Sequence, residues 1–319
     1  MVLAPVSAEY LLGYDDTIRE PAALVWGLLV FAPLYGAPAV IIREVARRRD
    51  QGWPTVLLLS AAAGLVQAGL IDQSLFNPDY RGIPYWADLR NPTYLPGLGF
   101  SAYMLVVFVG GHMIQSFAAP IAIVESLAGR AGHRAWLGVP GLMIMTVLYA
   151  TGAGFVVWDQ ARSEQFVASP AQLIGAAVVV LALVVAGLAL PRRTVRRDRV
   201  VPGAVIVAAV AVVSFAVHGS MPTSWLGVAG QAVSLGTLGA LVWRWSRSRN
   251  WGPRHVLAVA SAPLIVNAAL AFTVEPLGTG PALTRYATNS VLALLVVLLL
   301  LTAAHRVVSA GRGQGDHPR

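Results

Sequence analysis

The stretch AQLIGAAVVVLALVVAGLALPRRTVRRDR, residues 171–199, decides the fold class. Its first twenty residues carry no charged side chain, and four arginines follow within the next seven residues. A hydrocarbon slab about 30 Å thick requires about 20 apolar helical residues, because lipid cannot satisfy an unpaired backbone group. The stretch therefore predicts a transmembrane helix that ends at an arginine-rich membrane surface.

Eight further stretches of this kind lie on either side of it along the chain. They span residues 22–42, 54–71, 99–127, 136–158, 201–218, 225–243, 256–274 and 288–304. With 56% hydrophobic and 12% charged residues, the chain is too apolar for a water-soluble domain. The sequence thus predicts an all-α, polytopic transmembrane helix bundle of about nine spans.

Arginine is distributed unevenly over the loops between these stretches. If alternate loops lie on opposite sides, one side receives 18 of the 23 arginines, namely Arg43, Arg47, Arg48, Arg49, Arg130, Arg134, Arg192, Arg193, Arg196, Arg197, Arg199, Arg244, Arg247, Arg249, Arg254, Arg306, Arg312 and Arg319. The positive-inside rule makes that side cytoplasmic. The amino terminus is then predicted outside and the carboxyl terminus inside the cell membrane.

The predicted organisation is one transmembrane domain with short flanking segments. It consists of an extracytoplasmic tail at 1–20, a helical domain at 21–305 with an outer loop at 72–98 and a cytoplasmic basic loop at 191–199, and a cytoplasmic tail at 306–319. The first 20 residues lack the basic region of a signal peptide and carry four acidic residues, which favours an exported tail.

Composition excludes several kinds of chemistry. The net charge of +8 comes from arginines that flank apolar segments, so it indicates lipid headgroups rather than nucleic acid as the partner. The absence of cysteine removes disulfides and thiolate sites, and the absence of lysine removes Schiff-base chemistry. Because no HExxH, GxSxG or Walker motif is present, we expect no metal and no cofactor, and no catalytic residue can be assigned.

The third apolar stretch contains a polar face. Phe108, His112, Ser116 and Pro120 recur every fourth residue, with Gln115 beside them. One interpretation is that His112 and Ser116 satisfy a neighbouring helix or the carbonyl that the proline leaves free. The other is that His112 lines a wet cavity, where it would shuttle protons or hold a metal.

The second stretch carries a stripe of small residues. Ser60, Gly64 and Ala68 share one face and predict the close approach of another helix. Asp72 continues that face at the outer boundary, and Gln67 lies within the outer third. The stripe therefore places Asp72 close to a helix partner or to a cavity, although a carboxylate at the boundary is often merely solvated.

Polar residues of five spans fall in the predicted outer half. The predicted ligand-binding set is His112, Gln67, Asp72, Ser116, His218, Gln231 and Asn267. Around a common axis these groups would form a vestibule facing outward, whereas on separate surfaces they would be isolated interface residues. The aromatic-rich loop at 72–98 is then either a gating lid or a plain cap.

Glu44 and Glu125 close the cytoplasmic ends of the first and third spans. Arginines lie near both in the sequence. We expect interfacial ion pairs that contribute little to stability.

Three motifs resemble those of an uncharacterised group of prokaryotic polytopic membrane proteins. They are GWPTVLLLSAAAGLVQAGLIDQSLFNP at 52–78, FVGGHMIQSFAAPIAIVE at 108–125 and WLG at 136–138. The resemblance implies a helical membrane protein and brings no agreed activity. Phe108-x3-His112 is also similar to one element of the CAAX-type intramembrane proteases, but Gln67-Ala68 stands where their glutamates would be, and Pro222 stands where an asparagine would follow His218. Loss of the glutamates removes the general base that such proteases need.

These observations favour binding or transport of a small or lipid-like ligand through an outward-facing polar vestibule. A non-catalytic scaffold or partner subunit is one alternative. A membrane-embedded enzyme acting on a lipid or isoprenoid substrate is the other, and it requires His112 and Asp72 to converge within hydrogen-bonding reach.

Overall fold

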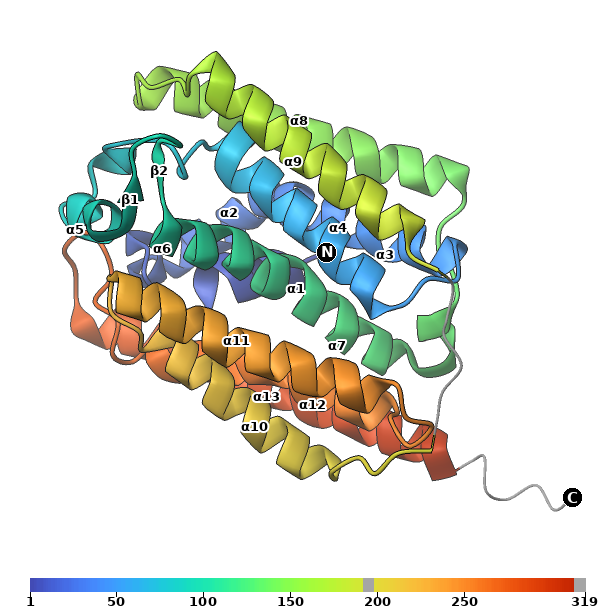
Figure 1. Ribbon diagram of the computed structural model, residues 1–319. Coiled ribbons are helices and arrows are strands. Elements are labelled where there is room, and N and C mark those ends of the chain that lie inside the picture. The colour runs from blue at the N-terminus through green and yellow to red at the C-terminus, as the bar shows by residue number, and fades with distance from the viewer. Residues whose placement is uncertain (192–197, 313–319) are drawn as a thin grey trace, which may run out of the picture.

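The computed structural model describes residues 1–191 and 198–312, and helices make up almost all of it (Figure 1). Five arginines that the sequence analysis assigns to the cytoplasmic side lie outside the described residues: Arg192, Arg193, Arg196, Arg197 and Arg319. The same holds for most of the basic loop at 191–199.

Eight helices within the described residues are long and apolar enough to cross a membrane. The first three are composite: α2 (Pro21–Phe31), η3 (Ala32–Gly36) and α3 (Ala37–Arg48); α4 (Trp53–Leu65) and η4 (Val66–Ile71); and α6 (Ala102–Leu105), η7 (Val106–Gly110), η8 (His112–Ala118) and α7 (Ala119–Ala128). The other five are α8 (Val139–Ser163), α9 (Pro170–Ala189), α11 (Trp225–Ser246), α12 (Pro253–Leu270) and α13 (Ala282–Arg312). The predicted all-helical, multi-pass membrane fold is confirmed.

The predicted stretch at 201–218 forms a shorter apolar helix, α10 (Ala204–Gly219). Its 16 residues extend about 24 Å at 1.5 Å per residue, somewhat less than the hydrocarbon thickness. All nine predicted apolar stretches are therefore helical. The last helix runs further than predicted, because α13 continues to Arg312 through residues assigned to the tail.

Local sequence signals explain where several helices begin. The Ser169 side chain accepts from the Gln172 backbone amide at the start of α9, and Ser224 caps α11 through the Gly227 amide. Pro21, Pro170 and Pro253 occupy first-turn positions, where a missing amide proton costs no hydrogen bond.

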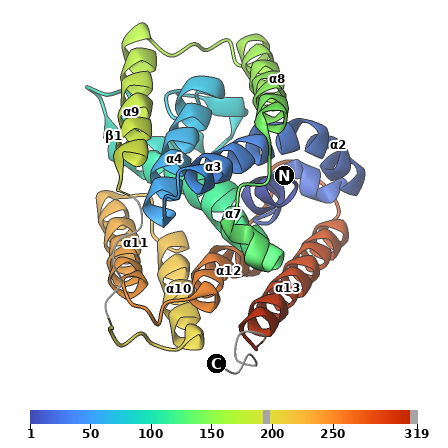
Figure 2. The ribbon, with the colours of Figure 1, turned by 90° about the vertical axis from the view of Figure 1, so that its right-hand side faces the viewer.

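Short connections make successive helices antiparallel, so two ends of the bundle can be named. The hairpin end, at the left of Figure 1, carries the segment 72–101, and the arginine end lies opposite, where α3 finishes in Arg47 and Arg48. The third span lies between two groups of helices, with α3, α4, α8 and α9 on one side and α10 to α13 on the other (Figure 2). Which end faces the cytoplasm remains a prediction from the arginine distribution.

The first 20 residues differ from the expected tail. They contain α1 (Leu3–Pro5), η1 (Val6–Tyr10) and η2 (Asp16–Arg19), and α1 and η1 are inserted among the spans. Ser7, Tyr10 and Leu11 are buried, and the Ser7 hydroxyl donates to Gln115 Oε1 at 3.0 Å. The physical reason is that residues 1–14 carry one charged side chain, Glu9, so the segment gains more from burial than from solvation.

The segment 72–101 is a folded cap over the hairpin end. It contains η5 (Tyr80–Gly82), α5 (Trp86–Arg90), η6 (Asn91–Thr93) and a two-stranded antiparallel hairpin of β1 (Tyr94–Leu95) and β2 (Phe100–Ser101). Trp86 is buried, stacks on Phe108 with ring centroids 5.8 Å apart, and donates from Nε1 to the Asn77 carbonyl at 2.9 Å. The aromatic side chains thus attach this cap directly to the third span.

Candidate functional site

Helix irregularities place the polar side chains of the site. The segments η1, η3, η4, η7 and η8 are all π-helical, and η8 contacts both η1 and η3. A π turn inserts an extra residue into an α-helix and is frequent at functional sites. Pro120 follows η8 closely, and its ring would clash with the Ser116 carbonyl in a regular helix, so the wider turn relieves that contact.

Two pairs of residues within the predicted ligand-binding set are in contact. Gln67 Nε2 donates to Asp72 Oδ2 at 3.3 Å, and His112 Nδ1 lies 2.9 Å from Ser116 Oγ. The two pairs lie on helices that pack against each other, since α4 contacts η8. Four of the seven predicted ligand-binding residues therefore belong to one group, contributed by the second and third spans.

The small-residue stripe brings these two spans together as predicted. A Cβ built on Gly64 would lie 2.9 Å from the Val109 carbonyl oxygen and 3.1 Å from His112 Cβ. Ser60 and Ala68 are fully buried on the same face. The glycine therefore sets the distance at which His112 meets α4.

The group also contains side chains that the sequence analysis did not select. The Tyr35 ring, on η3, stacks on His112 with centroids 5.5 Å apart. Glu9, on η1, accepts from the Tyr14 hydroxyl at 2.6 Å. Glu9 is the single acid within an otherwise apolar stretch at 1–14, and this pattern could have identified it as buried. The sequence analysis instead assigned the stretch to an exported tail.

We call Glu9, Tyr14, Tyr35, Gln67, Asp72, His112 and Ser116 the hairpin-end cluster. Within the described residues, neither Glu9 nor Asp72 forms an ion pair with an arginine; Arg81, which lowers the pKa of Glu9 from a distance, pairs with Asp15 at 3.1 Å. Burial raises the pKa of the Glu9 carboxyl, against the lowering effect of its tyrosine hydrogen bond. Burial likewise raises the pKa of Asp72, although the Ser74 amide donates to it at 2.9 Å. Both acids thus lack a fixed cationic partner.

The other three predicted residues lie apart from this cluster. Gln231 Nε2 reaches the His218 carbonyl at 3.5 Å between α11 and α10, and His218 Nδ1 has no hydrogen-bond partner in the described structure. Asn267 is half-buried on α12. No hydrogen bond, ion pair or ring contact given for residues 1–191 and 198–312 joins these three to the hairpin-end cluster.

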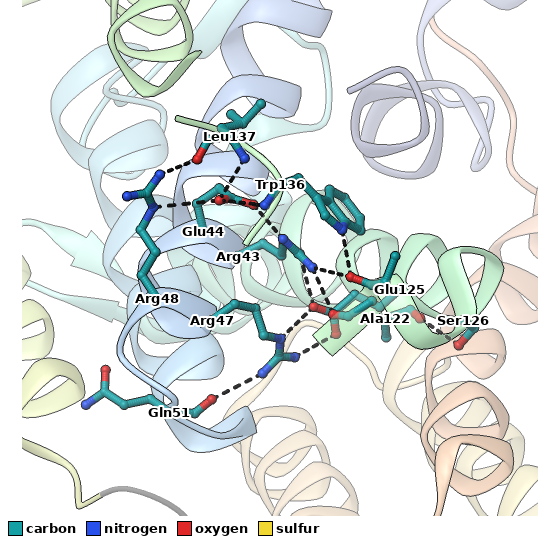
Figure 3. Close-up of polar contacts among 12 residues, drawn as sticks. Arg43, Glu44, Arg47, Arg48, Gln51, Ala122, Glu125, Ser126, Trp136 and Leu137 are labelled. Carbon is teal, nitrogen blue, oxygen red and sulfur yellow. Dashed lines mark hydrogen bonds and ion pairs between the residues drawn. The ribbon is translucent and has the colours of Figure 1, made fainter. Parts of the chain in front are cut away.

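A second polar cluster fills the arginine end (Figure 3). Arg47 binds both carboxylate oxygens of Glu125 at 2.6 Å, and Arg43 bridges Glu125 at 3.2 Å and Glu44 at 2.5 Å. The Trp136 amide donates to Glu44 at 2.9 Å, and the Arg43 guanidinium lies 3.5 Å from the Trp136 ring centroid. We call this the arginine-end network; it ties α3, α7 and the following loop together.

The ion pairs expected at Glu44 and Glu125 are present, but they are buried, so the expectation that they contribute little is not supported. The Glu44 side chain is 0% exposed and that of Glu125 is 9% exposed, because the segment 129–137 folds over them. Desolvated charges interact more strongly than exposed ones and are costly to leave unpaired. The network therefore holds the ends of the first and third spans together.

Within the described residues, no three His, Asp or Glu side chains gather in a way that could hold a metal ion. Ser116 is fully buried, with its hydroxyl against His112 Nδ1.

Comparison with known proteins agrees with the architecture. A family model described as "Uncharacterized membrane protein family" matches residues 1–312. The chain belongs to this family. The resemblance drawn from residues 52–138 is thereby confirmed and extended to nearly the whole chain, and the protein is an integral, multi-pass membrane protein in contact with a lipid bilayer. No curated protein and no solved structure gives a significant match.

Proposed function

We propose that this member of the family binds and transports a small ligand that carries a positive charge, with the hairpin-end cluster as the binding site. The observation that carries the proposal is the pair of carboxylates at Glu9 and Asp72, which have neutral hydrogen-bonding partners and no arginine paired to them in the described residues. An unpaired acid buried among helices is costly in a membrane and favours a role in binding or conduction.

The surroundings of the two acids suit a cation. Tyr35 and His112 stack on one side, and Tyr80, Trp86 and Phe108 form a second series of ring contacts beneath the cap. Aromatic faces attract cations, and a carboxylate supplies the countercharge. Protons compete for the same carboxylates, since burial raises the pKa values of Glu9 and Asp72.

Gln67, Asp72 and Ser116 are buried in this conformation, whereas Glu9 and His112 are partly buried. A narrow hollow beside Glu9 is lined by Tyr10, Gly13, Asp15 and Thr17. A ligand therefore reaches the acids when η1 or the cap segment moves, as expected for a transporter that alternates between open and occluded states. The alternative of a pure scaffold gives no reason to leave two acids without a cationic partner.

The first prediction tests the charge of the ligand with a defined probe. We expect tetramethylammonium chloride, at about ten times its Kd, to raise the Tm of the purified protein by about 3 °C relative to sodium chloride of equal ionic strength. The shift should be lost in Glu9→Gln and Asp72→Asn and kept in Asn267→Ala, the matched control outside the cluster. The same shift in all four proteins would refute the site.

The pH dependence has a definite sign. Because burial raises both carboxyl pKa values, the acids are protonated and neutral at low pH and become anionic as the pH rises. The tetramethylammonium shift should therefore grow between about pH 5 and about pH 8. A shift that is largest at the acidic end would contradict competition between the cation and protons.

A further inference from the structure

A separate hollow lies at the arginine end, on the surface between the first, second and fifth spans. It has a volume of about 270 Å³ and is lined by Arg48, Arg49, Gln51, Leu188 and Leu190. The spans α3 and α9 end beside it, and α4 begins there. The hollow therefore lies at the level where apolar helix surface gives way to polar loop, which in a bilayer is the headgroup layer.

Its lining combines two chemistries. Arg48 and Arg49 are exposed and present guanidinium groups, whereas Leu188 and Leu190 extend the apolar face of α9. Guanidinium groups bind phosphate through paired, charge-assisted hydrogen bonds. The leucines give a hydrocarbon chain a surface to continue along.

The arginines retain uncompensated charge. The Arg49 side chain forms no hydrogen bond or ion pair with any described residue. Arg48 donates from its guanidinium to the Leu137 carbonyl, and its Nε is 3.8 Å from Glu44 Oε2, so its charge is only partly compensated. Glu44 is already bound by Arg43 and by the Trp136 and Leu137 amides (Figure 3). Asp50, the next residue in the chain, has contacts of its own. An anion in the hollow would therefore meet a positive field.

Gln51 keeps the wall of the hollow in place and reduces repulsion of an anion. Its side chain is 97% buried, and Nε2 donates to the Leu188 and Leu190 carbonyls, both at 3.0 Å. These are carbonyls at the carboxyl end of α9, whose partial negative charge would otherwise face the site. Gln51 Oε1 is buried and has no donor among the described residues.

We propose that this hollow binds the phosphate of an anionic phospholipid, with Arg48 and Arg49 on the phosphate and the acyl chains along Leu188 and the outer face of α9. The site is distinct from the hairpin-end cluster and does not depend on what that cluster transports. A free phosphate ion shares the headgroup chemistry but makes no use of the leucines.

The second prediction follows lipid adducts by native mass spectrometry of the detergent-purified full chain, titrated with phosphatidylglycerol, with phosphatidylcholine or with inorganic phosphate. We expect saturable phosphatidylglycerol binding, which weakens about fivefold in Arg49→Gln and about thirtyfold in the double variant Arg48→Gln/Arg49→Gln. Phosphatidylcholine should bind weakly and equally to all variants. Arg49→Gln removes no side-chain hydrogen bond or ion pair with a described residue, so little effect on folding is expected.

The control is Arg249→Gln/Arg254→Gln, which removes two exposed arginines from another corner of the same end. Equal losses of phosphatidylglycerol in the control and the test variants would overturn the proposal, because they would indicate general attraction to positive charge. Complete displacement of the lipid by an equal concentration of inorganic phosphate would also overturn it, in favour of a free-anion site.

Discussion

Single charged side chains in this protein have opposite environments at the two ends of the bundle. At the hairpin end, Glu9 and Asp72 have neutral partners and raised carboxyl pKa values. At the arginine end, Glu44 and Glu125 are held by arginines and backbone amides. At the hairpin end the carboxylates remain available to a ligand. At the arginine end the carboxylates form ion pairs that hold helices together.

The third prediction tests the contribution of the arginine-end network to stability. Glu125→Gln removes the bidentate partner of Arg47 and leaves buried guanidinium charge, so we expect it to lower the free energy of unfolding by about 3 to 5 kcal/mol. Unfolding in mixed micelles titrated with dodecyl sulfate measures this. Asp198→Asn, which breaks an exposed pair with Arg249, should cost less than about 1 kcal/mol. Similar losses in the two variants would mean that the network is solvated rather than buried.

Physical reasons explain both which of these residues the sequence predicted and which residues it missed. Helical spacing is enough to put His112 and Ser116 on one face, and their hydrogen bond follows from it. Tyr35 and Glu9 reach the site through tertiary packing of η3 and η1, which spacing within one helix cannot reveal. His218, Gln231 and Asn267 share a depth in the sequence pattern, but depth does not fix which neighbour a helix faces.

Among the elements, the third span is the central helix of the bundle, because both groups of helices pack against it (Figure 2). Its contact with α4 depends on Gly64, where the backbone of one helix approaches the other. Its π turns could not be predicted, since the extra residue of each is stabilised by neighbouring segments and not by a local motif. Pro120 and the pair Gly110 and Gly111 were the local signs of an irregular helix in that span.

The fourth prediction tests the close approach at Gly64. We expect Gly64→Ala to lower the free energy of unfolding by about 1 to 3 kcal/mol, because the added methyl meets the Val109 carbonyl and His112 Cβ. Gly154→Ala on α8 is the matched control; nothing lies within 4 Å of its added methyl, and alanine should be neutral or stabilise the helix by up to about 1 kcal/mol. A neutral Gly64→Ala would show that the two spans can separate without cost.

At the scale of the whole molecule, hydropathy predicted every apolar helix, because the bilayer imposes its thickness on the sequence. It did not predict α1 and η1, which insert among the spans without crossing and are too short for that length criterion. The cap was expected to be either a lid or a plain cover, and its Trp86–Phe108 contact establishes only that it is packed on the third span.

The orientation of the bundle determines which side of the membrane each of these sites faces. If the arginine end is cytoplasmic, the hairpin-end cluster opens outward, and the hollow at Arg48 and Arg49 lies in the inner leaflet, where anionic lipids attract basic residues. The chain contains no cysteine, so single introduced cysteines report accessibility without background. Exposed positions are available at both ends, including Asp88 and Ser163 at the hairpin end and Asn250 at the arginine end.

The fifth prediction is the most direct test of the account. In intact cells, a membrane-impermeant maleimide should label Asp88→Cys and Ser163→Cys, whereas Asn250→Cys should react only after the membrane is permeabilised. Labelling of Asn250→Cys in intact cells, with Asp88→Cys and Ser163→Cys protected, would contradict the outward-facing cluster and the inner-leaflet lipid site together.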